Sequence, residues 1–195
     1  MRKMFFSLAV GLFLFSNAFA HSGGAGVTNA KAIELTAHRI DRLVALNKID
    51  GTFLKKLDKI EVVVVQNQSP VYYKVRVSQT LPAQGNPIQL DIAFDDDGKP
   101  LSFQLIPNGV AGPDIGWTEK SAGELTENAL HYVLENEKDP KIGLFDKAAT
   151  SFTLTKGVLN NQTVARGQVT SSATSEKLNI YLKLDGTFIS AEIIQ

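Results

Sequence analysis

Two stretches of the chain carry apolar residues at helical spacing. Residues three or four positions apart lie on the same side of a helix, so each stretch predicts a helix with one apolar face. We expect the first helix at about residues 28–47, with Thr28 or Asn29 as its N-cap. Its apolar stripe consists of Ile33, Ala37, Ile40 and Val44.

The second predicted helix has the clearer beginning. Ser121 and Glu124 stand three positions apart just ahead of an apolar run. This S-x-x-E spacing is typical of a capping box, in which each side chain accepts a hydrogen bond from the backbone N–H of the other residue. We expect the helix to continue to about Glu137. Its apolar stripe consists of Leu125, Ala129, Tyr132 and Val133.

After each predicted helix the hydrophobic period changes to two and β-branched residues dominate, which indicates strands. The next expected strands are residues 59–65, 71–77, 150–156 and 163–169. Each half of the chain then ends in a hairpin, because Asp97-Gly98 and Asp185-Gly186 each separate two apolar runs. Glycine accepts the positive φ of a tight turn and aspartate tolerates it. Three consecutive carboxylates, Asp95 to Asp97, therefore indicate a turn rather than a calcium loop, which needs alternating ligands.

The chain repeats itself. Residues 90–106 align with residues 178–194 without a gap, 88 positions later, and residues 32–36 match residues 122–126, 90 positions later. Self-similarity of this kind indicates a duplicated unit. The predicted fold is therefore α+β, with two tandem repeats, each one helix packed on an antiparallel sheet of three to four strands. The repeats span residues 28–106 and 118–195, and a Pro- and Gly-rich linker joins them at residues 107–117.

A single repeat is small and buries a thin core, so we expect the two repeats to dock on one another. Leucines that lie off the main helical stripes would make this contact: Leu35, Leu43, Leu46, Leu130 and Leu134. Each hairpin is expected to turn one apolar face toward its helix. These faces consist of Ile92, Phe94, Leu101, Phe103 and Leu105 in the first repeat, and Ile180, Leu182, Ile189, Ala191 and Ile193 in the second.

The first twenty residues have the pattern of a secretory signal peptide. Arg2 and Lys3 precede an apolar run, which is followed by an A-x-A pattern ending at Ala20. We expect cleavage after Ala20, a flexible leader at residues 21–27, and export to the periplasm or secretion beyond it. The chain has no cysteine, which excludes disulfide scaffolds, thiolate catalysis and zinc–thiolate sites.

Charge argues against nucleic acid as a partner. Lys and Arg number 20 and so do Asp and Glu, and the two signs are interspersed along the chain. Binding to a phosphate backbone needs a clustered positive surface. The sequence also lacks a G-x-S-x-G elbow and any other catalytic spacing. We therefore expect a protein that binds a partner and is not an enzyme.

The segment HRIDRLVALNKIDG, the strand VYYKVRV and the hairpin around DGKPLSF together resemble an exported PepSY module, and more broadly the cystatin-like arrangement of one helix on an antiparallel sheet. The closing pair LNIYLKLDGTFISAEI resembles that of small periplasmic proteins of unknown function. The PepSY resemblance implies binding of a protein or peptide, including a peptidase-inhibitor or chaperone-like role, and it implies no catalytic residues. An exposed sheet edge could accept an added strand, beside an open face carrying Tyr181, Lys183, Ser190 and Glu192.

The alternative is a copper-binding protein. Cleavage after Ala20 would make His21 the first residue, and its amine and imidazole could chelate Cu(II) in the tetragonal geometry that this ion favours. A second ligand could come only from His38 or His131, both of which we expect on solvated helix surfaces beside carboxylates. Copper titration of the mature chain and of a His21→Ala variant tests this hypothesis. Trp117 is expected to anchor the linker against the core.

Overall fold

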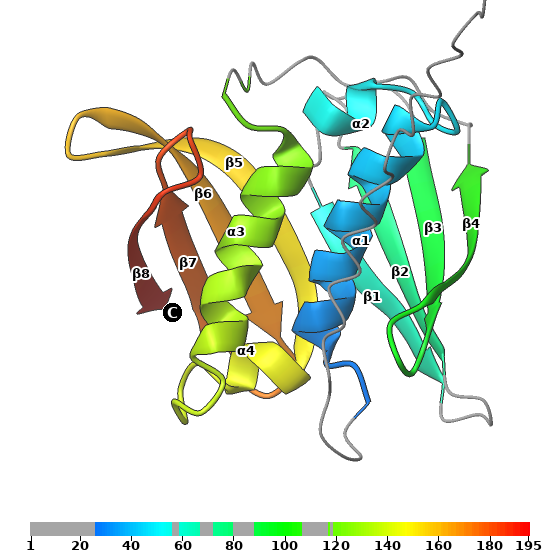
Figure 1. Cartoon of the computed structure of the whole chain (residues 1–195). Coiled ribbons are helices and arrows are strands. Elements are labelled where there is room, and N and C mark those ends of the chain that lie inside the picture. Colours follow the sequence, from blue (N-terminus) through cyan, green and yellow to red (C-terminus); the bar gives the residue numbers. More distant parts are fainter. Residues whose placement is uncertain (1–25, 56–58, 67–71, 80–87, 107–116, 118) are drawn as a thin grey trace, which may run out of the picture.

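The structure is a computed structural model, and it describes residues 26–55, 59–66, 72–79, 88–106, 117 and 119–195 (Figure 1). The predicted signal peptide, residues 21–25 of the predicted leader and residues 107–116 of the predicted linker lie outside these ranges.

Two long and two single-turn helices occur in the described residues. They are α1 (Asn29–Ala45), α2 (Thr52–Lys55), α3 (Ala122–Glu135) and α4 (Leu144–Lys147). Thr28 caps α1 and accepts a hydrogen bond from the backbone N of Lys31, at 3.2 Å. The predicted capping box of α3 is confirmed, since Ser121 and Glu124 bond each other's backbone N–H. Within the described ranges, no helix combines the length and the apolar character needed to span a membrane.

Eight strands of the described residues form one antiparallel sheet in the order β4-β3-β2-β1-β5-β6-β7-β8. They are β1 (Lys59–Gln66), β2 (Tyr72–Gln79), β3 (Ile88–Asp95), β4 (Pro100–Ile106), β5 (Ala149–Leu159), β6 (Gln162–Ser171), β7 (Lys177–Leu182) and β8 (Phe188–Ile194). The predicted α+β class is confirmed. The prediction of a separate sheet for each repeat is wrong, because β1 and β5 pair with one another. If the two sheets were separate, β1 and β5 would each expose backbone N–H and C=O groups without a hydrogen-bond partner.

The junction between β1 and β5 is short. Three residue pairs form it, and its central pair is Ile60 with Phe152. Both side chains are fully buried, beneath the helices α1 and α3, which pack side by side on one face of the sheet (Figure 1). One hydrophobic core therefore runs through both halves of the chain.

The expected docking leucines behave unequally. Leu43 and Leu130 are fully buried, and Leu35 and Leu134 are half-buried against the core. Leu46 is 55% exposed, so its predicted role in docking is wrong. The reason is that α1 ends at Ala45, and Leu46 is the C-cap residue beyond its last turn.

The apolar faces of the hairpins are also only partly covered. Ile92, Phe94, Ile180 and Leu182 are buried as expected. The prediction is wrong for β4, where Leu101, Phe103 and Leu105 are exposed by 55%, 39% and 38%. Helix α1 packs over β1, β2 and β5, while β4 lies at the far end of the sheet (Figure 1). The corresponding β8 residues are half-buried.

Both predicted hairpin turns are confirmed. Gly98 and Gly186 adopt positive φ angles of 78° and 87°, and the Asp95 carboxylate accepts hydrogen bonds from the backbone N of Asp97 and of Lys99. A third tight turn, between β5 and β6, was not predicted. Asn160 and Asn161 both have positive φ there, as the central residues of a two-residue hairpin loop require.

Candidate functional site

A groove runs between helix α3 and the end strand β8, and we call it the α3–β8 groove. It consists of two hollows, of about 380 Å³ and about 340 Å³, which share Tyr132 as a lining residue. The first hollow is lined by Asn128, His131, Tyr132, Glu135, Gly186 and Phe188. The second is lined by Tyr132, Asp139, Lys141, Ile142, Leu178, Ala191, Glu192 and Ile193.

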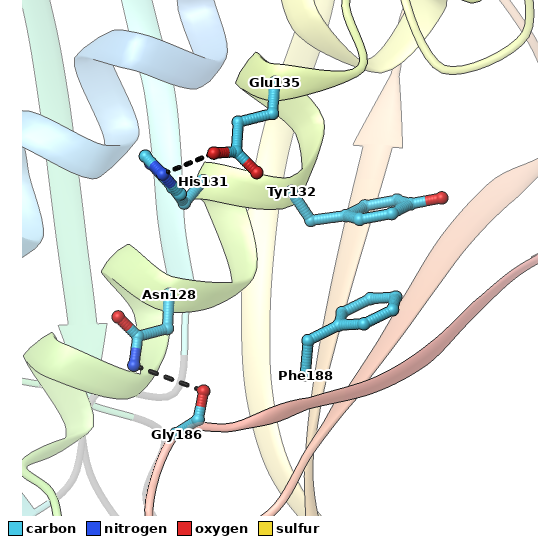
Figure 2. Close-up of a pocket in the computed structure, with 6 residues that line it drawn as sticks. All are labelled: Asn128, His131, Tyr132, Glu135, Gly186 and Phe188. Carbon is cyan, nitrogen blue, oxygen red and sulfur yellow. Dashed lines mark hydrogen bonds and ion pairs between the residues drawn. The ribbon is translucent and has the colours of Figure 1, made fainter.

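Two aromatic rings stand at the centre of this groove. Tyr132 of α3 and Phe188 of β8 stack with ring centroids 4.8 Å apart and ring planes 11° from parallel (Figure 2). Phe188 remains 46% exposed. Offset or parallel stacking holds aromatic side chains in one orientation and leaves their outer faces available. The pair therefore forms a fixed apolar surface that a ligand could cover.

Polar groups surround the first hollow. His131 Nε2 lies 2.9 Å from a Glu135 oxygen one helical turn later, and Asn128 Nδ2 donates to the carbonyl of Gly186 at 3.3 Å (Figure 2). A Cβ at position 186 would lie 2.2 Å from Asn128 Nδ2. The positive φ therefore favours glycine at this position, and a side chain there would also have to displace the Asn128 amide.

The charges of the groove are mostly negative. Glu135 and Asp139 contribute two carboxylates to the linings, against one ammonium group from Lys141, while the Glu192 carboxylate bonds Tyr181 on the open face of the sheet. Coulomb attraction in a partly enclosed groove favours a ligand with a cationic group over one with a carboxylate.

Strand β8 has a free edge beside this groove, because it pairs only with β7 among the described strands. On the open face of the sheet, the Tyr181 hydroxyl donates to Glu192 at 2.6 Å, and Asn179 contacts both. The hydrogen bond to Glu192 raises the pKa of Tyr181, since it favours the protonated phenol. Tyr181, Ser190 and Glu192 alternate with the helix-facing residues, as the sequence predicted, and Lys183 lies beyond β7 in the exposed turn.

A second group of titratable side chains lies where α1 meets α3. Ser121 donates to the Asp41 carboxylate at 3.3 Å, and His38 Nδ1 lies 3.5 Å from a Glu127 oxygen. Burial raises the pKa of Asp41, and burial raises the pKa of Glu127 to about 7. The imidazole of His38 acts in the opposite direction on both carboxyl groups.

Burial thus favours the protonated form of the Glu127 carboxyl group at the interface between the helices. Neither hollow of the α3–β8 groove includes His38, Asp41 or Glu127. Among the residues that the structure describes, no set of three or more His, Asp and Glu side chains is arranged to hold a metal ion. The cluster therefore joins α1 to α3 and lies outside the candidate groove.

The structure separates the predicted site residues. His38 is exposed and pairs with Glu127, whereas His131 is exposed and pairs with Glu135, so the predicted solvated positions are confirmed. His21 lies outside the described residues, and the copper hypothesis stays a prediction. Trp117 packs against the core as expected, with the ammonium of Lys156 5.4 Å from its ring centroid.

The sequence did not point to Phe188 as part of a candidate site. Tyr132 was assigned to a core stripe, and Phe188 stands 56 positions further along the chain. No local pattern joins the two residues. The one available signal was an aromatic residue two positions after the Gly186 turn, where the hairpin places it beside the helix.

No family model matches the chain, and no curated protein or solved structure gives a match either. The resemblance to PepSY modules accordingly stays a prediction.

Proposed function

We propose that the mature chain is an exported, non-enzymatic binding protein of the periplasm, and that its ligand is an extended segment of a protein or peptide. The segment binds in the α3–β8 groove and adds a strand to the free edge of β8. The PepSY resemblance extends this proposal to a peptidase-inhibitor or chaperone-like role, in which the bound segment belongs to the partner protein.

The observation that carries this proposal is the position of the two hollows. They follow one another along α3 and β8 and share Tyr132 of the stacked pair, whose partner Phe188 lines the first hollow. In strand addition, main-chain hydrogen bonds supply affinity and pockets for alternate side chains supply specificity. Side chains of an added strand that point toward the helix would enter the groove.

The linings indicate which side chains fit. The first hollow combines aromatic faces with Glu135, and the second combines Ile142, Leu178 and Ile193 with Asp139. A basic side chain in the first hollow would meet the Glu135 carboxylate and the Phe188 ring. An aliphatic side chain in the second would cover the exposed parts of the isoleucines. The preferred ligand therefore alternates basic and aliphatic residues on one face.

We also propose that residues 28–106 and 118–195 are two copies of one PepSY-like or cystatin-like unit. Equivalent contacts support this proposal. Thr36 and Thr126, 90 positions apart and both fully buried, each donate to the carbonyl four residues earlier at 2.8 Å. Gly98 and Gly186, 88 positions apart, occupy equivalent turns.

The register at the centre of the sheet supports the duplication independently. Ile60 pairs with Phe152, which stands 92 positions later. Gln168 of β6 likewise stands 92 positions after Arg76 of β2. Arg76 pairs with Asp91 on β3, and Gln168 pairs with Asn179 on β7. If Ile60 and Phe152 are equivalent, the pair lies on a local twofold axis. Duplicated units meeting about such an axis would give this register.

Fluorescence anisotropy with synthetic peptides tests the binding function. The probes are labelled peptides of alternating threonine and valine with a central lysine, leucine or glutamate. We expect the lysine peptide to bind most tightly and the glutamate peptide about tenfold or more weaker, because the groove is acidic.

Phe188→Ser is the matching variant, and Phe103→Ser on the opposite end strand is its control. Loss of the Phe188 ring should weaken binding of the lysine peptide about tenfold or more, whereas Phe103→Ser should leave it unchanged. Equal binding of all three peptides to the wild type and to the Phe188→Ser variant would contradict the proposal. Circular dichroism of both variants shows whether each is folded.

A further inference from the structure

Strand β4 forms the other end of the sheet and pairs only with β3 among the described strands. Three apolar side chains project from its helix side without a helix above them. They are Leu101, Phe103 and Leu105, exposed by 55%, 39% and 38%. Soluble proteins usually protect such an edge with charged residues, proline or a bulge. In β4 the proline and the bulge occur at its beginning, and no charged residue stands between Leu101 and Ile106.

The sequence of β4 is chemically symmetric about Phe103. Leu101 and Leu105 stand two positions on either side, and Ser102 and Gln104 stand one position on either side. In an antiparallel pair of two such strands centred on Phe103, each leucine faces a leucine and each serine faces a glutamine. The apolar residues of both strands would then share one face, because alternate residues of a strand point the same way.

We propose that β4 is a homodimer interface, in which two copies of this chain pair their β4 strands antiparallel about Phe103. The occupant of the apolar face of β4 is thus the same face of a second copy. A self-complementary patch of this kind gives an isologous, closed dimer. This proposal goes beyond the peptide-binding function, since the α3–β8 groove lies at the opposite end of the sheet.

The molecule already contains a junction of the same geometry. Strands β1 and β5 pair antiparallel about Ile60 and Phe152, with α1 and α3 on the same face of the sheet. Pairing of β4 with a second β4 would likewise keep the helices of both copies on one face. Strand β8 is less suited to the same contact, because Glu192 interrupts its uncharged run and its apolar residues after Phe188 are half-buried.

Sedimentation velocity of the mature wild-type chain at increasing concentration tests the proposal first. We expect a monomer–dimer equilibrium. Leu101→Glu and Leu105→Lys should each weaken dimerisation at least about tenfold, because each places an unpaired charge in an apolar contact. Phe188→Lys on the opposite end strand is the matched control and should leave the dimer intact.

The double variant Leu101→Glu with Leu105→Lys tests the register. In the proposed dimer, position 101 of one copy faces position 105 of the other, so the introduced carboxylate and ammonium form two opposite-charge pairs. We expect the double variant to recover dimerisation to within a few-fold of the wild type. Circular dichroism identifies any variant that fails to fold, and Phe103→Ser then serves as a milder replacement expected to weaken the dimer.

A wild-type chain that remains monomeric at every concentration overturns the proposal. A dimer that the single charges leave intact, or that Phe188→Lys dissociates, also overturns it. Failure of the double variant to recover while both single variants are folded monomers contradicts the register centred on Phe103. None of these outcomes depends on peptide binding, so each proposal can fail separately.

Discussion

The hydroxyl of Thr28, the N-cap residue of α1, donates a 2.6 Å hydrogen bond to the carboxyl group of Asp146 in α4. Asp146 is fully buried, and burial raises its pKa. The reciprocal contact joins Ser121, the N-cap of α3, to Asp41 of α1. Each long helix is therefore capped by a residue that an aspartate from the other half of the chain holds in place.

Thr28→Ala removes the cap of α1 and the hydrogen bond to Asp146 together. We expect it to lower the free energy of unfolding by about 1–2 kcal/mol, because the cap is lost and the buried carboxyl group loses the hydrogen bond from the Thr28 hydroxyl. Thr28→Ser keeps the hydroxyl, so it should lower the free energy of unfolding by less than half as much as Thr28→Ala does. Urea unfolding of the three proteins measures the difference. Equal losses in both variants would show that the methyl group, and not the hydroxyl, is responsible.

A salt bridge on the open face of the sheet gives a second prediction. Arg76 bonds both oxygens of the buried Asp91, at 2.7 and 2.9 Å, and Lys74 adds a contact at 2.8 Å. The hydrogen bonds from Arg76 lower the pKa of Asp91. Asp91→Asn should cost about 2 kcal/mol at pH 7. A lowered carboxyl pKa gives stability above the unfolded value of 3.8 that disappears as the pH falls through the folded value.

The proposed duplication predicts a compensation at this pair. The equivalent residues of the second half, Gln168 and Asn179, form a 2.9 Å amide hydrogen bond. Arg76→Gln combined with Asp91→Asn recreates that pair, so the double variant should be more stable than the sum of the two single losses implies. Urea unfolding of all four proteins completes the cycle. Strict additivity would count against equivalence of the two pairs.

Two glycines of the β5–β6 hairpin provide a matched pair of packing variants. A Cβ at Gly167 would lie 2.7 Å from the Phe152 ring and 3.1 Å from Ala129, whereas a Cβ at Gly157 would meet atoms no nearer than 3.7 Å. We expect Gly167→Ala to destabilise the fold by about 1–3 kcal/mol through overpacking. Gly157→Ala should be neutral or slightly stabilising. Thermal unfolding measures the stability of both variants. If Gly167→Ala did not change the stability, Phe152 and Ala129 would not be tightly packed against Gly167.

The carboxyl group of Glu127 makes stability depend on pH. Burial raises its pKa from 4.5 to about 7, while His38, Asp41, Glu34 and Glu124 act on it through their charges. A raised carboxyl pKa means that the folded state holds the proton more tightly. The associated stability is therefore complete below pH 4.5 and is lost as the pH rises to about 7.

Glu127→Gln should remove this loss. At pH 8 we expect the variant to be more stable than the wild type by about 1 kcal/mol, after discounting for the partial exposure of the side chain. At pH 4.5 the two should be alike. Glu119→Gln, at an exposed position just ahead of the same helix, serves as the control and should leave the difference in stability between pH 4.5 and pH 8 unchanged. A wild-type profile that is flat over this range would contradict the assignment.

Local signals made much of the fold predictable. The α3 capping box and the turns at Gly98 and Gly186 each depend on a few neighbouring residues, so the sequence predicted them correctly. The pairing of β1 with β5 joins residues about 90 positions apart. The sequence of neither strand shows whether its free edge pairs with another strand or faces solvent. For this reason two separate sheets were expected.

Burial depends on where a helix ends as well as on periodicity. Phe103 follows the same alternation as Ile92, its partner across β3 and β4, yet Ile92 is buried and Phe103 is exposed. Alternation predicts which face a side chain occupies. It does not predict how far α1 covers that face. The candidate groove was missed for a similar reason, since its stacked pair Tyr132 and Phe188 forms only when the β7–β8 hairpin reaches α3.

Amide hydrogen exchange of the mature chain, with and without a saturating amount of the lysine-centred peptide, tests the proposed binding mode most directly. An added strand pairs with the free backbone groups of β8, so exchange in residues 188–194 should slow while exchange in residues 100–106 of β4 stays unchanged. Unchanged exchange in residues 188–194, with the peptide bound, would contradict strand addition at β8.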